Sequence, residues 1–195
     1  MINFPFPIPI AFYDNIDLVD NLRSYIISMD EDGIKSDVAT TIKHNLSESK
    51  FDFFDTCEPC VVNLKNWIAG RLGDTVNQLN ETKENFDIIF RDSWYHVTKK
   101  YGVHDYHTHP NCSWCGIYYL DDIDESVGGL TRFFCPFDFG YLDVGNKKIS
   151  DTSFSVTPRK GLLCLFPSFL GHSQQLYTGE TDRVVVAFNC CVQRP

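Results

Sequence analysis

FDIIFRDSWYHVT, residues 86–98, is the point at which the hydrophobic pattern of the chain changes. Its apolar residues are β-branched or aromatic and come in short runs, which is typical of β-strands. Similar runs, separated by Gly, Pro, Asp and Asn, continue to the C-terminus: SWCGIYYL (113–120), LTRFFC (130–135), FSVTP (154–158), GLLCLF (161–166) and RVVVAFNCCV (183–192). The pattern predicts an all-β C-terminal half, folded as a sandwich or a barrel.

The chain before residue 86 predicts two helices. In the first, which Asp14 or Asn15 can cap, apolar residues recur at helical spacing from Leu18 to Met29. The second runs from about residue 58 to 80, with one apolar stripe made by Val61, Leu64, Ile68, Leu72, Val76 and Leu79. We therefore expect an α+β fold in which N-terminal helices pack against one sheet.

Length and composition predict one domain. A chain of 195 residues that is 43% hydrophobic can bury one sizeable core, and it contains no repeat or linker that would divide it. We expect a single domain over residues 1–195, with a mainly helical part at 1–85 and the strand-rich core at 86–195.

The net charge of the chain limits the kinds of molecule it is expected to bind. Seventeen Lys and Arg against 26 Asp and Glu give a net charge of −9, the wrong sign for a protein that neutralises the phosphates of a nucleic acid. No stretch approaches the roughly 20 apolar residues of a membrane span, and Pro5, Pro7 and Pro9 interrupt the apolar N-terminal segment. We expect a cytoplasmic protein without a cleaved signal, acting on a small molecule or a protein. The sequence leaves the oligomeric state open, a homodimer included.

The eight cysteines include two CxxC pairs, Cys57/Cys60 and Cys112/Cys115. The pairs are too far apart in the sequence for a compact zinc ribbon. Without a secretory signal, reduced thiols are expected.

HDYHTHPN, residues 104–111, holds three of the six histidines of the chain. In a β-strand residues i and i+2 point to the same face, so His107 and His109 can direct two imidazoles at one metal ion. His172, which follows the strand-like run GLLCLF, is the best candidate for a third ligand. Asp105 is also two positions from His107, which leaves Asp105, His107 and His172 as an alternative set.

Three protein ligands on one side of a metal leave positions open for substrate, cosubstrate or dioxygen, as in non-heme iron oxygenases. Arg183 adds to this pattern, because it opens an otherwise apolar strand and a buried charge requires a partner. A carboxylate ligand held by the two-donor fork of the guanidinium would be such a partner. His96 and His104 are expected to be surface or packing residues.

Three segments together resemble the 2-oxoglutarate-Fe(II) oxygenases. They are WYHVTKKYGVHDYHTHPNCSWCGIYYL (94–120), GGLTRFF (128–134) and TPRKGLLCLFPSFLGHSQQLYTGETDRVVVAFN (157–189). They are similar to a subgroup with the motifs HxHPxxxxSGxYYL, GxLxxFPSxxxH and RxSxxFN. The resemblance spans most of the chain, and it is the order and spacing of the motifs that make it specific.

The resemblance implies a double-stranded β-helix, a cupin-like jelly-roll of two facing antiparallel sheets with iron at one mouth. It assigns His107, His109 and His172 to the metal ligands and Arg183 to the far carboxylate of 2-oxoglutarate. Fe(II), 2-oxoglutarate and dioxygen are the implied cofactors, and a hydroxylase is the implied enzyme.

Two departures from the subgroup pattern stand out. Cys115 replaces the serine before GIYYL, and Val185 replaces the serine two residues after the arginine. The second change removes a hydroxyl that would help to bind the cosubstrate carboxylate, and Asn111, Tyr118 or Tyr119 could supply a substitute.

Two other hypotheses stay open at the level of sequence. One is a three-histidine cupin-type dioxygenase that needs no 2-oxoglutarate, against which Arg183 argues. The other is a non-catalytic jelly-roll binding protein that has kept the ligand residues.

Overall fold

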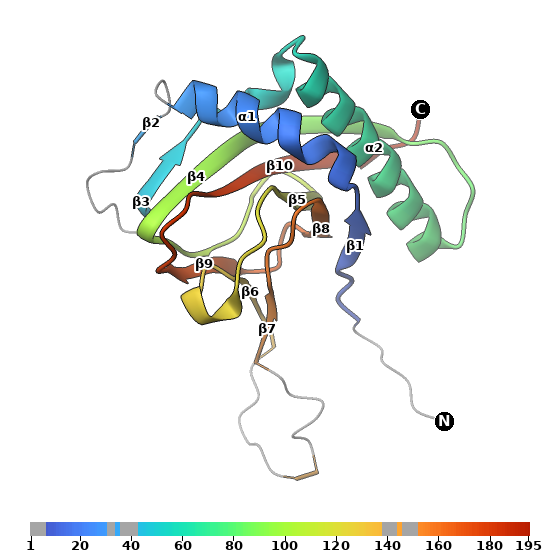
Figure 1. Ribbon diagram of the computed structural model, residues 1–195. Helices are drawn as coiled ribbons and strands as arrows, with labels where there is room; N and C mark the ends of the chain where they lie inside the picture. Colours follow the sequence, from blue (N-terminus) through green and yellow to red (C-terminus); the bar gives the residue numbers. More distant parts are fainter. Residues whose placement is uncertain (1–6, 31–33, 36–42, 138–143, 146–151) are drawn as a thin grey trace.

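A large antiparallel sheet, covered on one face by two helices, dominates the computed structural model, which describes residues 7–30, 34–35, 43–137, 144–145 and 152–195 (Figure 1). The helices are α1 (Val19–Met29) and α2 (Pro59–Asn80), with single 3-10 turns η1 (Ile16–Leu18), η3 (Phe53–Asp55) and η4 (Glu125–Val127). The strands are β1 (Ala11–Asp14), β2 (Ile34–Lys35), β3 (Lys43–Glu48), β4 (Asp87–His107), β5 (Trp114–Tyr119), β6 (Thr131–Phe134), β7 (Ser153–Val156), β8 (Leu162–Pro167), β9 (His172–Tyr177) and β10 (Arg183–Gln193).

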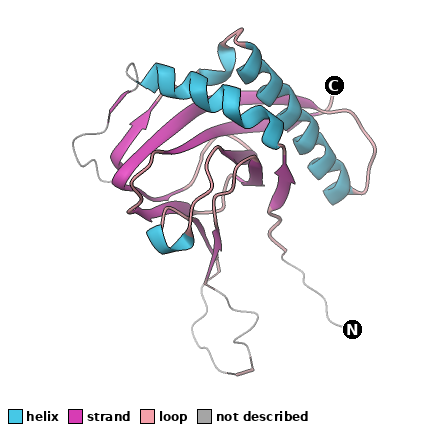
Figure 2. Cartoon of the chain, in the orientation of Figure 1, coloured by secondary structure: helices cyan, strands magenta, loops and turns pink. Residues whose placement is uncertain are grey.

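The sheet is curled into two layers. Its strand order is β1-β8-β5-β10-β4-β9-β6-β7, with β3 also paired to β4. Phe133 of β6 nevertheless packs on Phe166 of β8, with ring centroids 4.8 Å apart, although several strands separate β6 from β8 in that order. The β9-β6-β7 end of the sheet therefore folds back over the β8-β5-β10 region, which makes the jelly-roll of a double-stranded β-helix (Figure 2).

Strand alternation divides the apolar residues between two cores. On β10, Val184, Val186 and Phe188 face the helices, and Val185 faces the interior of the roll. The helix-side core includes the buried stripe of α2, namely Val61, Leu64, Ile68, Leu72 and Val76. Because successive residues of a strand point to opposite faces, these strands need apolar residues at nearly every position.

β4 belongs to both layers of the roll. Its first part pairs with β10 from Asp87 to Thr98, and its last part pairs with β9 from Gly102 to His107. Between them Tyr101 has a φ of 65°, and a Cβ on Gly102 would lie 2.3 Å from Thr98 Cγ2. The bend at this point thus requires a glycine, and it carries the chain toward the second layer.

The expected α+β jelly-roll and both helices are confirmed, but the N-terminal part is less purely helical than expected. β1 pairs with β8 and β3 pairs with β4, so both belong to the sheet. β9, with the sequence HSQQLY, was also not expected, because its polar residues hide the strand pattern. Residues 1–6, which include Pro5, lie outside the described residues.

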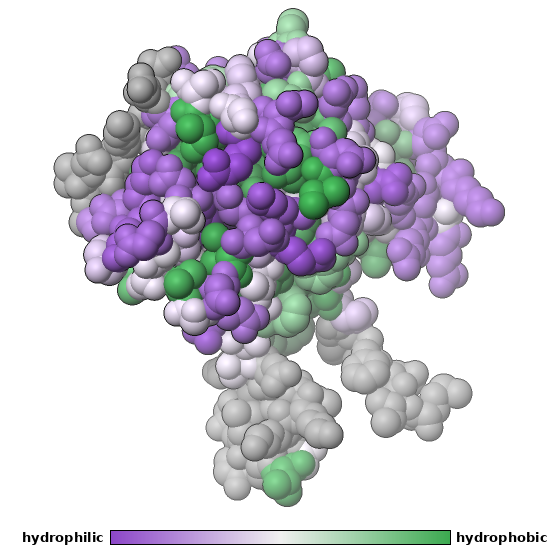
Figure 3. Space-filling view, in the orientation of Figure 1, coloured by the Kyte–Doolittle hydropathy of each residue, from purple (hydrophilic) through white to green (hydrophobic). Residues whose placement is uncertain are grey.

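Hydrophilic residues dominate the face of the molecule shown in Figure 3, with small apolar patches between them. Among the described residues, no helix combines the length and the apolar character that a membrane crossing requires.

Two glycines test the packing of the sheet against the helices. A Cβ on Gly116 of β5 would lie 2.2 Å from Phe188 Cζ, whereas a Cβ on Gly70 of α2 would meet no atom within 4 Å. We expect Gly116→Ala to lower the free energy of unfolding by about 1–3 kcal/mol through overpacking. Gly70→Ala is expected to raise it by about 0.5–1 kcal/mol, because alanine favours the helix. Chemical denaturation measures both, and an unchanged stability of Gly116→Ala would contradict the packing described here.

Candidate metal centre

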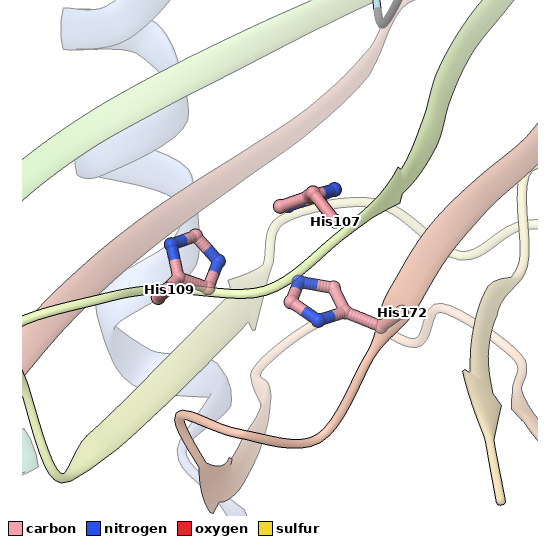
Figure 4. A group of neighbouring side chains, drawn as sticks. All are labelled: His107, His109 and His172. Atoms are coloured by element: carbon pink, nitrogen blue, oxygen red, sulfur yellow. The ribbon is translucent and has the colours of Figure 1, made fainter. Parts of the chain in front are cut away.

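Three histidines from two strand ends converge at one mouth of the roll. His107 is the last residue of β4, His109 follows it by two positions, and His172 is the first residue of β9. One ligand atom from each lies within 4.8 Å of the others, and the ring centroids of His107 and His172 are 4.3 Å apart. Figure 4 shows the three rings grouped around a common space. Spacing of this kind allows three imidazoles to bind one metal ion.

Sheet register and one loop hydrogen bond bring the three residues together. His107 and His172 are direct partners in the pairing of β4 with β9. The prediction that His109 shares a strand with His107 is wrong, because β4 ends at His107. His109 is instead positioned after the strand, where its backbone N–H donates to Ser168 O at 3.2 Å.

Backbone carbonyls orient two of the rings. Nδ1 of His107 lies 2.8 Å from Asp105 O, and Nδ1 of His172 lies 3.1 Å from Leu170 O. A carbonyl only accepts, so each Nδ1 carries the proton and each Nε2 keeps its lone pair for a metal. Asp105 thus contributes its backbone carbonyl, while the residue itself is exposed and is not one of the three clustered side chains.

Burial keeps the three imidazoles neutral. Desolvation lowers the pKa of His109 to about 4 and that of His172 to about 3, and it also lowers the pKa of His107. Neighbouring imidazoles act in the same direction, because one positive charge disfavours another. At neutral pH the rings are therefore unprotonated, which is the form that binds a metal.

His96 and His104 are buried behind the cluster and are not surface residues. His104 stacks on His107 with ring centroids 4.0 Å apart and an interplanar angle of 15°. His96 packs edge-on against His104, and its Nε2 lies 2.6 Å from a carboxylate oxygen of Glu48. The structure shows the packing role that was expected as the alternative for both residues. The stacking of His104 fixes the ring plane of His107, a candidate ligand.

Arg183 is buried in the same roll. It is 2% exposed, and among the described residues no carboxylate forms an ion pair with it. Its Nη1 donates to Gln174 Oε1 at 2.8 Å, while its Nε has no hydrogen-bond partner. Burial lowers the pKa of the guanidinium, so an anionic ligand would stabilise its charged form.

Gln174 is a site residue that the sequence analysis missed. It is 7% exposed, and its Oε1 accepts from both Arg183 Nη1 and Thr98 Oγ1. Gln174 lies two positions after His172 on β9, so strand alternation would have placed both on one face had β9 been recognised.

The remaining candidates for cosubstrate binding lie in three different places. Tyr118 faces the helices, where its hydroxyl donates to Asn15 O, so it is on the wrong side of the sheet. Asn111 is exposed and does not line the cavity. Tyr119 faces the interior, its ring 5.8 Å from Arg183 Cζ and its hydroxyl 2.8 Å from Thr131 Oγ1. Of the three, only Tyr119 is near the arginine.

A narrow cavity of about 40 Å³ joins the histidines to Arg183. Its walls include Thr131 and Gln174, together with the two residues that depart from the subgroup pattern, Cys115 and Val185. All eight cysteines are free thiols, and the Sγ atoms of Cys112 and Cys115 lie 3.8 Å apart. The cavity, which we call the Arg183 cavity, thus has three candidate metal ligands at one part of its wall and a buried guanidinium at another.

Comparisons with solved structures place this fold among oxygenases. A prolyl-4-hydroxylase from Pseudomonas putida has a TM-score of 0.63 at 17% identity, with 96% of this chain and 94% of that chain covered. HygX from Streptomyces hygroscopicus with nickel and 2-oxoglutarate bound has a TM-score of 0.64 at 16% identity, covering 94% and 82%. A prolyl hydroxylase from Trichoplax adhaerens, in complex with a peptide fragment, has a TM-score of 0.61 at 12% identity, covering 93% and 82%. At these identities the likeness establishes the fold.

The family comparison covers the site itself. The model described as "Putative 2OG-Fe(II) oxygenase" matches residues 92–189, just over half of the chain. A comparison with curated proteins found no match. The matched segment contains the three clustered histidines, Gln174 and Arg183. The chain therefore belongs to the 2OG-Fe(II) oxygenases, enzymes that use iron, 2-oxoglutarate and dioxygen.

Proposed function

We propose that His107, His109 and His172 hold Fe(II), that Arg183 binds the far carboxylate of 2-oxoglutarate, and that the enzyme hydroxylates its substrate. The observation that carries this proposal is the pairing, in one cavity, of a three-imidazole cluster with a buried arginine that has no counter-ion among the described residues.

The donor set fits iron. Imidazole is a good ligand for Fe(II), and three ligands from one side leave positions for the cosubstrate and dioxygen. Most facial triads include a carboxylate, and here the carboxylate that is two positions from His107 in the sequence, Asp105, is exposed and outside the cluster. Three neutral imidazoles leave the ion its full charge, so anionic 2-oxoglutarate would supply the compensating charge.

The polar groups of the Arg183 cavity suit a carboxylate of the cosubstrate. The free Nε–H of Arg183 and its forked geometry suit a carboxylate, which accepts two parallel hydrogen bonds. Gln174 holds one arm of the fork, and Tyr119 and Thr131 form a hydroxyl pair close to it. The side chains of Gln174, Tyr119 and Thr131 would thus do what the serine hydroxyl, absent at Val185, does in the subgroup pattern: help to bind the cosubstrate carboxylate.

When bound, iron and 2-oxoglutarate supply the oxidising chemistry: dioxygen is consumed, 2-oxoglutarate becomes succinate and carbon dioxide, and one oxygen atom enters a substrate C–H bond. The contribution of the chain is to bind, orient and exclude water. His104 fixes the plane of His107 by stacking, and the rings of Phe133 and Phe166 pack against His172. These apolar contacts shield one side of the centre from solvent.

The prolyl hydroxylases among the similar structures support hydroxylation as the reaction type. The 2-oxoglutarate bound to HygX supports the same cosubstrate. A three-histidine dioxygenase that uses no 2-oxoglutarate would leave Arg183 buried without an anion to bind. A binding protein without turnover would hold metal and 2-oxoglutarate but form no succinate.

The metal ligands can be tested one by one. We expect His107→Ala, His109→Ala and His172→Ala each to abolish stoichiometric Fe(II) binding, because two imidazoles cannot replace three. Asp105→Ala should retain the metal, since that carboxylate lies outside the cluster. Anaerobic metal analysis after gel filtration measures the outcome. Retention by His109→Ala together with loss in Asp105→Ala would make Asp105 the third ligand.

The role of Arg183 has a separate test. Arg183→Met keeps much of the side-chain volume and removes the charge, and we expect it to weaken 2-oxoglutarate binding by about 10- to 100-fold, the value of one or two charged hydrogen bonds. Ni(II) binding should be unchanged. Arg132→Met, at an exposed position of β6, is the matched control. Calorimetric titration of the Ni(II)-loaded proteins measures both affinities, and equal 2-oxoglutarate affinity in the two variants would remove Arg183 from the site.

A further inference from the structure

A second opening reaches the three-histidine cluster from the side away from Arg183. It is a cleft of about 380 Å³ bounded by Phe51, Asp92, Trp94 and Asn189, and we call it the Asp92 cleft. His107 and His109 line both this cleft and the Arg183 cavity. These two candidate metal ligands therefore face both openings, one of which the cosubstrate would occupy.

The sheet register separates the two openings. Along β4 the residues Asp92, Trp94, His96 and Thr98 share the inner face, because strand residues alternate. Thr98 is paired with Arg183 and Asp92 is paired with Asn189 on β10. Six residues of strand separate the two pairs, which corresponds to roughly 20 Å. An anion held at Arg183 thus leaves the Asp92 end of the face for another molecule.

Asp92 is held in place by a buried amide. Asn189, which is 6% exposed, donates from Nδ2 to Asp92 Oδ2 at 3.1 Å, and its own Oδ1 accepts from Cys115 Sγ at 3.3 Å. No basic side chain of the described residues forms an ion pair with Asp92. The buried amide therefore fixes the orientation of a carboxylate that no described residue neutralises.

The other charges of the cleft offset one another. Glu48 forms ion pairs with Lys43 and with His96 when that ring is protonated. Among the described acidic and basic residues that line the cleft, Lys43 and Glu48 pair with each other and Asp92 has no ion-pair partner, so the cleft favours a cation.

The wall beside Asp92 is aromatic. Phe51 is 50% exposed and packs edge-on against Trp94, with ring centroids 5.2 Å apart. Trp94 in turn lies 5.8 Å from His109, and its buried Nε1–H has no hydrogen-bond partner among the described residues. An apolar surface thus extends from the carboxylate to the candidate metal ligands.

We propose that the Asp92 cleft binds the primary substrate, and that this substrate carries a cationic amine or guanidinium group, recognised by Asp92, next to an apolar part that lies on Trp94 and Phe51. The proposal rests on the proposed function, since it takes the three histidines as the reaction centre. A free amine and a cationic side chain of a peptide share this chemistry.

Calorimetric titration of the Ni(II)- and 2-oxoglutarate-loaded protein with paired probes tests the proposal. Phenethylamine is compared with neutral 2-phenylethanol, and N-acetyl-lysine amide with N-acetyl-norleucine amide. We expect at least one cation to bind about 3- to 10-fold more tightly than its neutral partner, as a partly buried ion pair allows. The pair that shows the preference identifies a free amine or a peptide side chain as the source.

Substitutions test whether Asp92 causes the preference for the cationic probe. Asp92→Asn should abolish it, and Asp87→Asn, at an exposed position of the same strand, should retain it. Phe51→Ala, a change at a half-exposed ring, should weaken phenethylamine and 2-phenylethanol equally. Equal affinities for cation and neutral probe in the unmodified protein, or a preference that survives Asp92→Asn, would overturn the proposal.

The same titrations separate this proposal from the proposed function. If 2-oxoglutarate fails to bind the Ni(II)-loaded protein, the assignment of the Arg183 cavity fails. The probes are then titrated into the protein with Ni(II) alone, where a cation preference that depends on Asp92 would still support the cleft and its absence would refute it.

Discussion

The pairing of β4 with both β10 and β9 is the constraint on which the rest of the structure depends. β4 is 21 residues long and bends at Gly102, so one strand contributes to both layers of the roll. Its first part aligns Thr98 with Arg183, and its last part aligns His107 with His172. Arg183 and the candidate metal ligands His107 and His172 are therefore held relative to one another by backbone hydrogen bonds, which position side chains more firmly than loops do.

One face of the sheet packs against the helices and stabilises the fold, and the other face lines the candidate site. Toward the helices, β4, β5, β8 and β10 present apolar side chains that bury the stripes of α1 and α2. Toward the interior, the same strands present Asp92, Trp94, Arg183 and Asn189 among apolar neighbours. Each polar group in this interior either has an internal partner or faces a cavity, as buried polar groups require. The unpartnered Nε of Arg183 and the uncompensated charge of Asp92 thus stand out as positions for ligands.

Much of the fold and part of the site could be predicted from the sequence. Helical periodicity predicted α1 and α2, and the short β-branched runs predicted most strands of the roll, because local patterns record which face is buried. β1, β3 and β9 were missed, since short or polar strands owe their conformation to their neighbours in the sheet. The fold brings His107, His109, His172 and Arg183 to one cavity, whereas Tyr118 faces the helices and Asn111 is exposed.

The sequence by itself determined which candidate ligand groups the chain offers, because three imidazoles and an arginine stand in or beside its strand-like runs. Only the tertiary structure decided between Asp105 and His109 as a member of the cluster, since that depends on where β4 ends and how the loop after it is tied to Ser168. It also decided that Gln174 supports Arg183 and that Asp92 lies at a second opening. Contacts of this kind join residues far apart in the chain, and strand register, which no local pattern encodes, sets them.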